Sequence, residues 1–151
     1  MIEILPKFIT TELSCFKIIW SIPPPKSFLS EELLLYYLHT GYSFSCCAHV
    51  LSKAANKYPH FRLYLKNIIL LKPDEHHLLD QGSEKHRIDY AKKVKTADWS
   101  KIDKLREELL QEYKKYFPST VGIIIGYHYS PDEVLEVIRV LNGKFMDAIQ
   151  S

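Results

Sequence analysis

A long helical pattern between a run of three prolines and a single later proline constrains the fold of this chain more than any other feature. Proline fixes φ and removes a backbone donor, so Pro23-Pro24-Pro25 and Pro59 delimit the segment between them. Within residues 30–58, apolar residues recur every three or four positions: Leu34, Tyr37, Gly41, Phe44, Ala48, Leu51 and Ala55. This spacing predicts one long helix that starts at Ser30 and is buried along Leu34, Phe44 and Leu51.

Further segments carry helical signals on both sides of this pattern. The apolar spacing predicts helices over residues 10–20, 61–69, 83–94 and 100–116, and a last helix that starts at residue 130. Serines at positions 83 and 130 suit the caps of two of them, because a hydroxyl accepts hydrogen bonds from the first turn. Asn142-Gly143 is expected to end or bend the last helix.

The segment Val121-Gly-Ile-Ile-Ile-Gly-Tyr127 allows two interpretations. Its β-branched run favours a buried strand, and its glycines weaken a helix. Because a lone strand has no partner here, we interpret the segment as a buried helix. The sequence therefore predicts an all-α helical bundle that forms a single domain over residues 1–151.

Composition excludes several classes of partner. The net charge is only +2, and the basic run Lys92, Lys93 and Lys95 is typical of a solvated helix face, so no nucleic-acid partner is expected. No apolar run reaches the roughly 18 residues that span a bilayer, and the start has no signal-peptide features. Three cysteines, two of them adjacent, make a poor disulfide framework, which favours a reducing, cytoplasmic location.

Residues 72–86 hold the densest collection of chemically useful side chains. Three histidines and four carboxylates fall within these fifteen residues. His76 and His77 are adjacent, so a helix directs them about 100° apart, and we expect at least one to face solvent. This is the one stretch of the sequence where a metal site or acid–base machinery would be easy to assemble.

The order of several features resembles a known family. They are the run 29–33, the aromatic residues Tyr36, Tyr37, Tyr42 and Phe44, then Pro59, residues 65–68, Asp74-Glu75 and residues 82–86. Over residues 28–94 this order is similar to the haem-oxygenase-like helical superfamily, which includes TenA-type thiaminases, the PqqC oxidase and iron-containing redox enzymes. The resemblance implies a haem-oxygenase-like bundle, in a shortened form.

The resemblance also implies metal ligands. Glu75 matches the first metal-ligating glutamate of the diiron members and His86 the first histidine, while His128 stands where a further glutamate is found. Glu136 is the nearest downstream carboxylate of use as a ligand. Nothing after His128 matches the family's final His-x-x-x-Asp-x-x-His set, and the thiaminase cysteine has no secure counterpart. The expected set is Glu75, His86 and His128, a facial arrangement that suits ferrous iron.

Each candidate also has a structural interpretation. Glu75 and His86 would form a surface hydrogen-bonded pair, and His128 would be a core histidine. Cys46 and Cys47 would be small core residues on an apolar helix. The tyrosine-rich face at Tyr36, Tyr37 and Tyr42 would belong to the core or line a pocket between helices.

Three functions remain open at this point. The first is an iron-dependent oxidase, and the second is a non-catalytic member of the same superfamily that binds a partner or holds a small ligand in the helical core. The third is an unrelated helical interaction protein. The missing final ligand set favours the second. A shortened bundle leaves an apolar face uncovered, so a homodimer is also expected.

Overall fold

The computed structural model describes residues 11–38, 43–54, 57–118 and 129–150. The α-helices are α1 (Glu12–Ser21), α2 (Leu35–Leu38), α3 (Pro73–Gln81), α4 (Glu84–Lys93), α5 (Trp99–Tyr116) and α6 (Pro131–Gln150). Short 3-10 helices are η2 (Ser43–Cys46), η3 (Pro59–Phe61) and η4 (Leu65–Asn67), and the strands are β1 (Cys47–His49) and β2 (Ile68–Leu70). Among the sequence features discussed above, Gly41, Tyr42, Ala55, Val121–Tyr127 and His128 lie outside the described residues.

The two strands form an antiparallel sheet, so the prediction of an all-α bundle is wrong. Ala48 pairs with Ile69, flanked by the pairs Cys47–Leu70 and His49–Ile68. Each strand has only three residues, and all of them except His49 are buried. A segment this short suits a buried helix or a buried strand equally well. The protein is therefore mostly helical around a small sheet.

The long helix predicted over residues 30–58 is also wrong. Only α2, which has four residues, is α-helical in the described part of this range. Glu31 has a φ of 64°, a left-handed conformation that prevents a right-handed helix from starting at Ser30. Leu34 and Leu51 are buried as expected, but Phe44 is 43% exposed, so its predicted burial is wrong.

A buried asparagine explains why residues 61–69 do not form the predicted helix. The Asn67 side chain accepts a hydrogen bond from the backbone N–H of Leu51 (2.7 Å) and donates to the carbonyls of Leu51 and Phe61 (3.1 and 3.2 Å). Such side chain–backbone bonds compete with a helical ladder. They hold the chain as two 3-10 turns that lead into β2.

Helices with local start signals are found where they were predicted. Ser83 caps α4, and Ser130 exchanges backbone–side-chain hydrogen bonds with Glu133 at the start of α6. The helix α6 continues to Gln150, so of the two outcomes expected at Asn142-Gly143, an end or a bend, the end is wrong. The buried Asn142 side chain instead bonds the backbone of residues 63–65, which gives this polar residue a role inside the helix.

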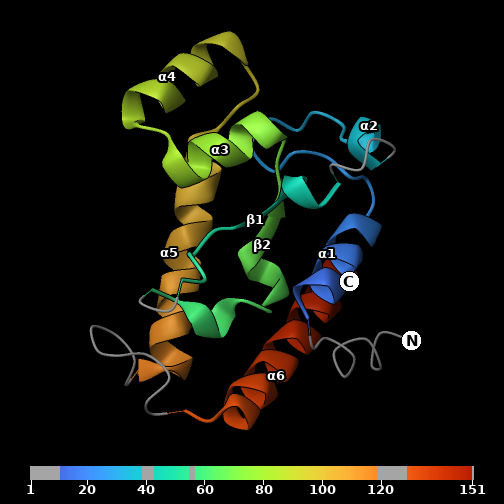
Figure 1. Cartoon of the computed structure of the whole chain (residues 1–151), viewed down its shortest axis with the longest axis vertical. Helices are drawn as coiled ribbons and strands as arrows, with labels where there is room; N and C mark the ends of the chain where they lie inside the picture. The colour runs from blue at the N-terminus through green and yellow to red at the C-terminus, as the bar shows by residue number, and fades with distance from the viewer. Residues whose placement is uncertain (1–10, 39–42, 55–56, 119–128, 151) are drawn as a thin grey trace.

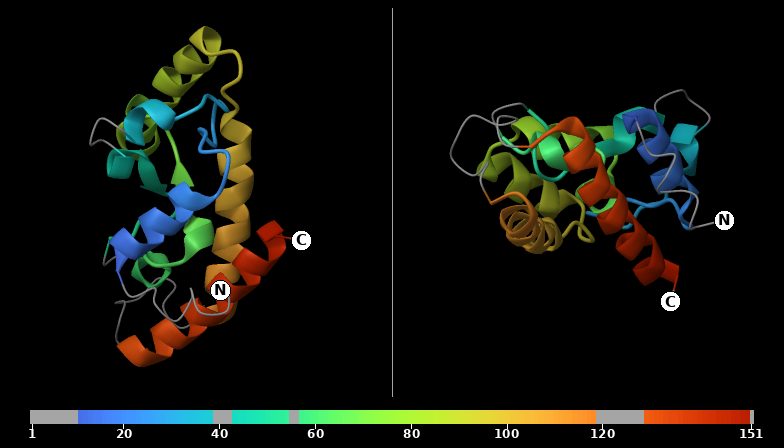
Figure 2. Two further views of the ribbon diagram at one scale, coloured as in Figure 1. Left: turned by 90° about the vertical axis from the view of Figure 1, so that its right-hand side faces the viewer. Right: turned by 90° about the horizontal axis from the view of Figure 1, so that it is seen from below.

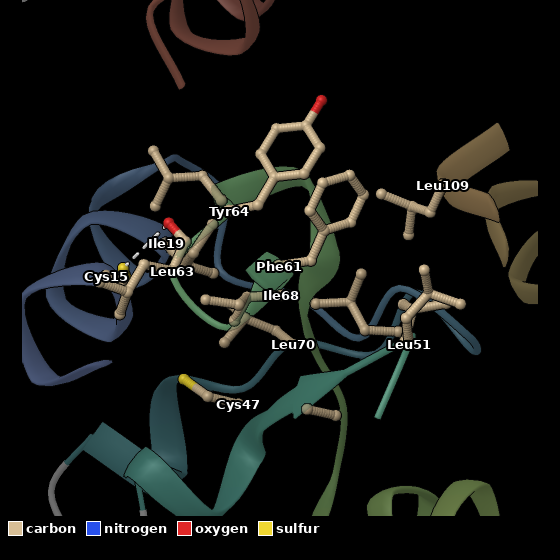
Figure 3. Packing of buried hydrophobic residues seen from close by; sticks show 14 of the residues in the cluster. Cys15, Ile19, Cys47, Leu51, Phe61, Leu63, Tyr64, Ile68, Leu70 and Leu109 are labelled. Atoms are coloured by element: carbon tan, nitrogen blue, oxygen red, sulfur yellow. Dashed lines mark hydrogen bonds between the residues drawn. The ribbon is translucent and has the colours of Figure 1, made fainter. Parts of the chain in front are cut away.

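The sheet lies between α5 on one side and α1 and α6 on the other, while α3 and α4 cross the end of α5 (Figures 1 and 2). Phe61, Tyr64 and Leu109 pack in the core around β2 (Figure 3). The Cys15 thiol, also shown there, donates to the Leu63 carbonyl at 3.5 Å. None of the helices in the described ranges is long and apolar enough to cross a membrane.

Candidate functional site

Glu75, the first predicted metal ligand, is a fully buried carboxylate at the start of α3. Its Oε1 accepts hydrogen bonds from Ser27 Oγ (2.6 Å) and from the backbone N–H of Lys72 (2.9 Å). Its Oε2 accepts a third from the Tyr90 hydroxyl at 2.7 Å. Three donors therefore compensate the cost of burying this charge.

This network joins three separate segments. Ser27 Oγ also accepts from the backbone N–H groups of Leu29 and Ser30, both at 3.1 Å, so Glu75 fixes the turn at residues 27–30. Tyr90 connects the carboxylate to α4. Burial, and then the hydrogen bond to Glu75, raise the pKa of Tyr90, which keeps its hydroxyl a donor. The hydrogen bonds of Glu75 therefore have a structural role, because they join the turn at residues 27–30 to α3 and α4.

The histidines of residues 72–86 have other partners. His86 is exposed on α4, with Nδ1 2.9 Å from Ser83 Oγ. His77 is exposed, as expected for at least one of the adjacent pair. The two ring nitrogens of His76 lie 2.7 Å from the Ser45 carbonyl and 3.1 Å from Asp80 Oδ2. Both neighbours are acceptors, so only the doubly protonated ring donates to both.

The hydrogen-bond partners of Glu75 and His86 give no support to an iron site. Nowhere in the described segments do three His, Cys, Asp or Glu side chains group so that they could hold a metal ion. Glu75 and His86 have no hydrogen-bond partner in common, and the oxygens of Glu75 already accept from Ser27, Lys72 and Tyr90. Because His128 lies outside the described residues, the three-residue metal set stays a prediction.

The three cysteines are buried thiols that form no disulfide with one another, consistent with the interpretation of Cys46 and Cys47 as small core residues. Cys46 lies on η2 and Cys47 on β1, so their placement on a helix is corrected. Burial raises the pKa of Cys46 to about 11, and that of Cys15 and Cys47 to about 12. These thiols stay protonated near neutral pH and are poor nucleophiles.

A cleft of about 690 Å³ lies among α1, β1, the following loop, α3 and α5. We call it the basic cleft; it is lined by Phe16, Phe44, Cys47, His49, Val50, Leu51, Ser52, Lys53, Lys57, Tyr58, His76, Leu79, Asp80, Arg106 and Leu110. Its size is that of typical small-molecule sites. Aromatic rings and cations occur together on its walls, and none of its cations had been singled out in the sequence.

The hydrogen bond of His49 defines which of its two ring nitrogens carries the proton. Its Nε2 lies 2.9 Å from the Arg62 carbonyl, which can only accept, so Nε2 carries the proton. Burial lowers the pKa of His49 and so favours the neutral ring. In that state Nδ1 is a hydrogen-bond acceptor. The Phe16 ring meets the imidazole edge-on, with centroids 6.2 Å apart.

The charges of the basic cleft favour an anion. Lys53 forms an ion pair with Glu12, whose Oε2 lies 3.7 Å from an Arg62 nitrogen, so one carboxylate serves two cations. Arg106 lies 3.8 Å from Asp103, at the edge of ion-pair range. Lys57 has no ion pair with any residue that the structure describes. The lining also holds one carboxylate, Asp80, which lies 3.1 Å from a ring nitrogen of His76. The cations of the lining therefore outnumber its carboxylates, and Lys57 is the one left outside the ion pairs of the described residues.

Sequence reasoning missed these cleft residues because they come from four separate segments. Phe44 had been assigned to the core, and Lys57 and Arg106 look like ordinary surface cations in the sequence. The approach of α3 and α5 to the loop after β1 brings them together. Such long-range proximity leaves no local pattern in a single sequence.

Comparison with known proteins gives no match: no family model, curated protein or solved structure matches this chain. The resemblance of residues 28–94 to the haem-oxygenase-like superfamily therefore stays a prediction that depends on the quoted residues alone. The all-α fold that it implied is not observed, because β1 and β2 form a sheet. Function has to be argued from the sites themselves.

Proposed function

We propose that this protein is a non-catalytic binding protein whose basic cleft holds a small anion with an aromatic or apolar body. The observation that carries the proposal is that one cleft of about 690 Å³ holds both aromatic rings and cations, of which Lys57 has no ion pair with the described residues. An aromatic carboxylate or an aromatic phosphate ester has both features. This develops the ligand-binding alternative left open by the sequence.

The two parts of such a ligand would meet different walls. Phe16, Phe44 and Tyr58 offer ring faces and edges, with Phe16 and Phe44 centroids 5.9 Å apart. Lys57 and Arg106 supply the positive charge, and the planar guanidinium suits two oxygens of a phosphate or carboxylate. Phe44 is 43% exposed, which leaves its ring accessible for such packing.

Binding without catalysis is supported by the state of the nearest reactive groups. Within the described residues, the His49 ring makes one hydrogen bond, to the Arg62 carbonyl, and none to a nucleophilic side chain. The Cys47 thiol in the same cleft stays protonated, since burial raises its pKa to about 12. Ser52 Oγ accepts from the backbone N–H of Ala54 at 3.3 Å. A nucleophile hydrogen-bonded to a base, which covalent catalysis uses, is not among these groups.

Calorimetric titration with phenyl phosphate tests the proposal. Inorganic phosphate and phenol, which each carry half of the probe, are the ligand controls. Phenyl phosphate should bind more tightly than either. Lys57→Met and Arg106→Met should each weaken it by up to about fivefold, as expected for partly exposed charge pairs. Arg139→Met is the matched control, because Arg139 lies on α6 outside the cleft and pairs with Glu136.

Two results would contradict the proposal. Equal affinity of the wild type, Lys57→Met and Arg106→Met for phenyl phosphate would remove the cleft as its binding site. Release of inorganic phosphate from the probe by purified protein, at a rate abolished by His49→Gln, would show that the cleft is catalytic.

A further inference from the structure

A second hollow of about 540 Å³ lies where the chain after α1 passes β2, α5 and α6. We call it the apolar groove, because most of its lining is apolar, including Ile22, Phe28, Ile69, Leu105 and Phe145. It shares no lining residue with the basic cleft. Ile22, Phe28, Leu105 and Phe145 are partly exposed, so apolar surface remains open to a ligand.

Three lysines line this groove, but they differ in their partners. Lys26 pairs with Glu31 at 3.3 Å. Lys66 pairs with Glu112 at 2.5 Å and with Glu108 at 3.4 Å. Lys101 forms no ion pair with the described residues, and its Nζ lies 5.7 Å from the Phe28 ring centroid. One cation outside the ion pairs therefore stands beside an apolar surface. Its charge also acts on the exposed Asp98 carboxylate, whose pKa is lowered first by a hydrogen bond from Ser100 and further by Lys101.

From this combination we infer that the apolar groove binds a single-chain carboxylate amphiphile, of the chemical class of a medium-chain fatty acid. The alkyl chain lies along Ile22, Ile69 and Leu105, and its carboxylate pairs with Lys101. Burial of alkyl groups drives binding, by up to about fourfold in affinity for each CH₂ removed from water. The charge of Lys101 selects a carboxylate over a neutral head group.

The backbone argues against an extended peptide as the occupant. A peptide that adds to a sheet needs a free row of backbone donors and acceptors on an edge strand. At the groove, the Leu70 carbonyl of β2 already accepts from the backbone N–H of Phe28 at 2.8 Å. The segment that carries Phe28 thus covers this part of the strand edge, and an alkyl chain needs no such hydrogen bonds.

Titration of the whole chain with dodecanoate below its micelle concentration tests the inference, with dodecanol as the neutral control ligand. Lys101→Met should weaken dodecanoate by about fivefold and leave dodecanol unchanged. Lys114→Met, an exposed lysine further along α5, should change neither. Affinity should also rise from octanoate through decanoate to dodecanoate, and Lys57→Met in the basic cleft should not affect it.

Ile22→Trp, which fills the groove, should abolish binding of both ligands while circular dichroism stays like that of the wild type. The inference is overturned if Lys101→Met binds dodecanoate as well as the wild type, or weakens dodecanoate and dodecanol equally. It is also overturned if affinity does not rise with chain length. These outcomes are independent of phenyl phosphate binding in the basic cleft.

Discussion

Glu75→Ala should destabilise the protein strongly, because three donors depend on the Glu75 carboxylate. The substitution leaves the buried Ser27 Oγ and the partly buried Lys72 N–H without their acceptor. An unpaired buried donor costs about 1–3 kcal/mol, and the Lys72 N–H adds a smaller cost. The Tyr90 hydroxyl is partly buried and recovers a bond to water. The carboxylate's own desolvation cost is removed, so we expect a net loss of about 3 kcal/mol.

Glu75→Gln separates hydrogen bonding from charge. The glutamine Oε1 can still accept from Ser27 and the Lys72 N–H, and its amide can donate to the Tyr90 hydroxyl, which also accepts. Only the strengthening of these hydrogen bonds by the negative charge is lost, so we expect Glu75→Gln to lower the free energy of unfolding by about 1 kcal/mol. Urea unfolding followed by circular dichroism measures both variants. In a chain of this length, Glu75→Ala should lower the Tm by about 6–12 °C.

Asp89→Ala is the matched control, because Asp89 is an exposed carboxylate on α4 and should change stability by less than about 0.5 kcal/mol. A Glu75→Ala protein as stable as the wild type would refute the structural role of the network. A second refuting result is equal destabilisation by Glu75→Gln and Glu75→Ala, because the glutamine keeps the hydrogen bonds that the alanine removes.

Asn142→Leu should cost about 2–4 kcal/mol in urea unfolding, because it leaves a buried N–H and a carbonyl of residues 63–65 unpaired. Burial lowers the pKa of His60, so this residue makes the fold less stable as pH falls below the unfolded value of about 6.5. His60→Phe should therefore reduce the loss of Tm between pH 7 and pH 5; an unchanged loss would contradict this. The homodimer stays a prediction, and light scattering should give twice the chain mass. Tyr36 is 71% exposed, so it is a candidate for the apolar surface that a second subunit would cover. Tyr36→Glu should therefore restore the mass of the monomer.

The structural features that could be predicted from the sequence were those set by residues close together in the chain, such as the helix caps. The caps of α4 and α6 follow from Ser83 and Ser130, whose hydroxyls accept from backbone groups three residues ahead. The strands could not be predicted in this way. Ala48 pairs with Ile69 across a loop, and either segment alone has the composition of a buried helix.

The candidate sites were predictable to a smaller extent. Residues 72–86 were singled out for their histidines and carboxylates, but two of the three donors to Glu75, Ser27 and Tyr90, lie outside this stretch. A buried glutamate with three donors and a metal-binding glutamate have the same sequence signature. The basic cleft depends on loop, α3 and α5 positions that only the fold brings together.

The most direct test of the proposed function is to map phenyl phosphate onto the folded protein by ¹H–¹⁵N NMR. The proposal predicts that the largest amide shifts cluster at Lys53, Lys57, Tyr58, Arg106 and Leu110, which line the basic cleft. Inorganic phosphate alone should move the same amides less. Saturable shifts confined to other parts of the chain, or shifts unchanged in the combined Lys57→Met and Arg106→Met variant, would contradict it.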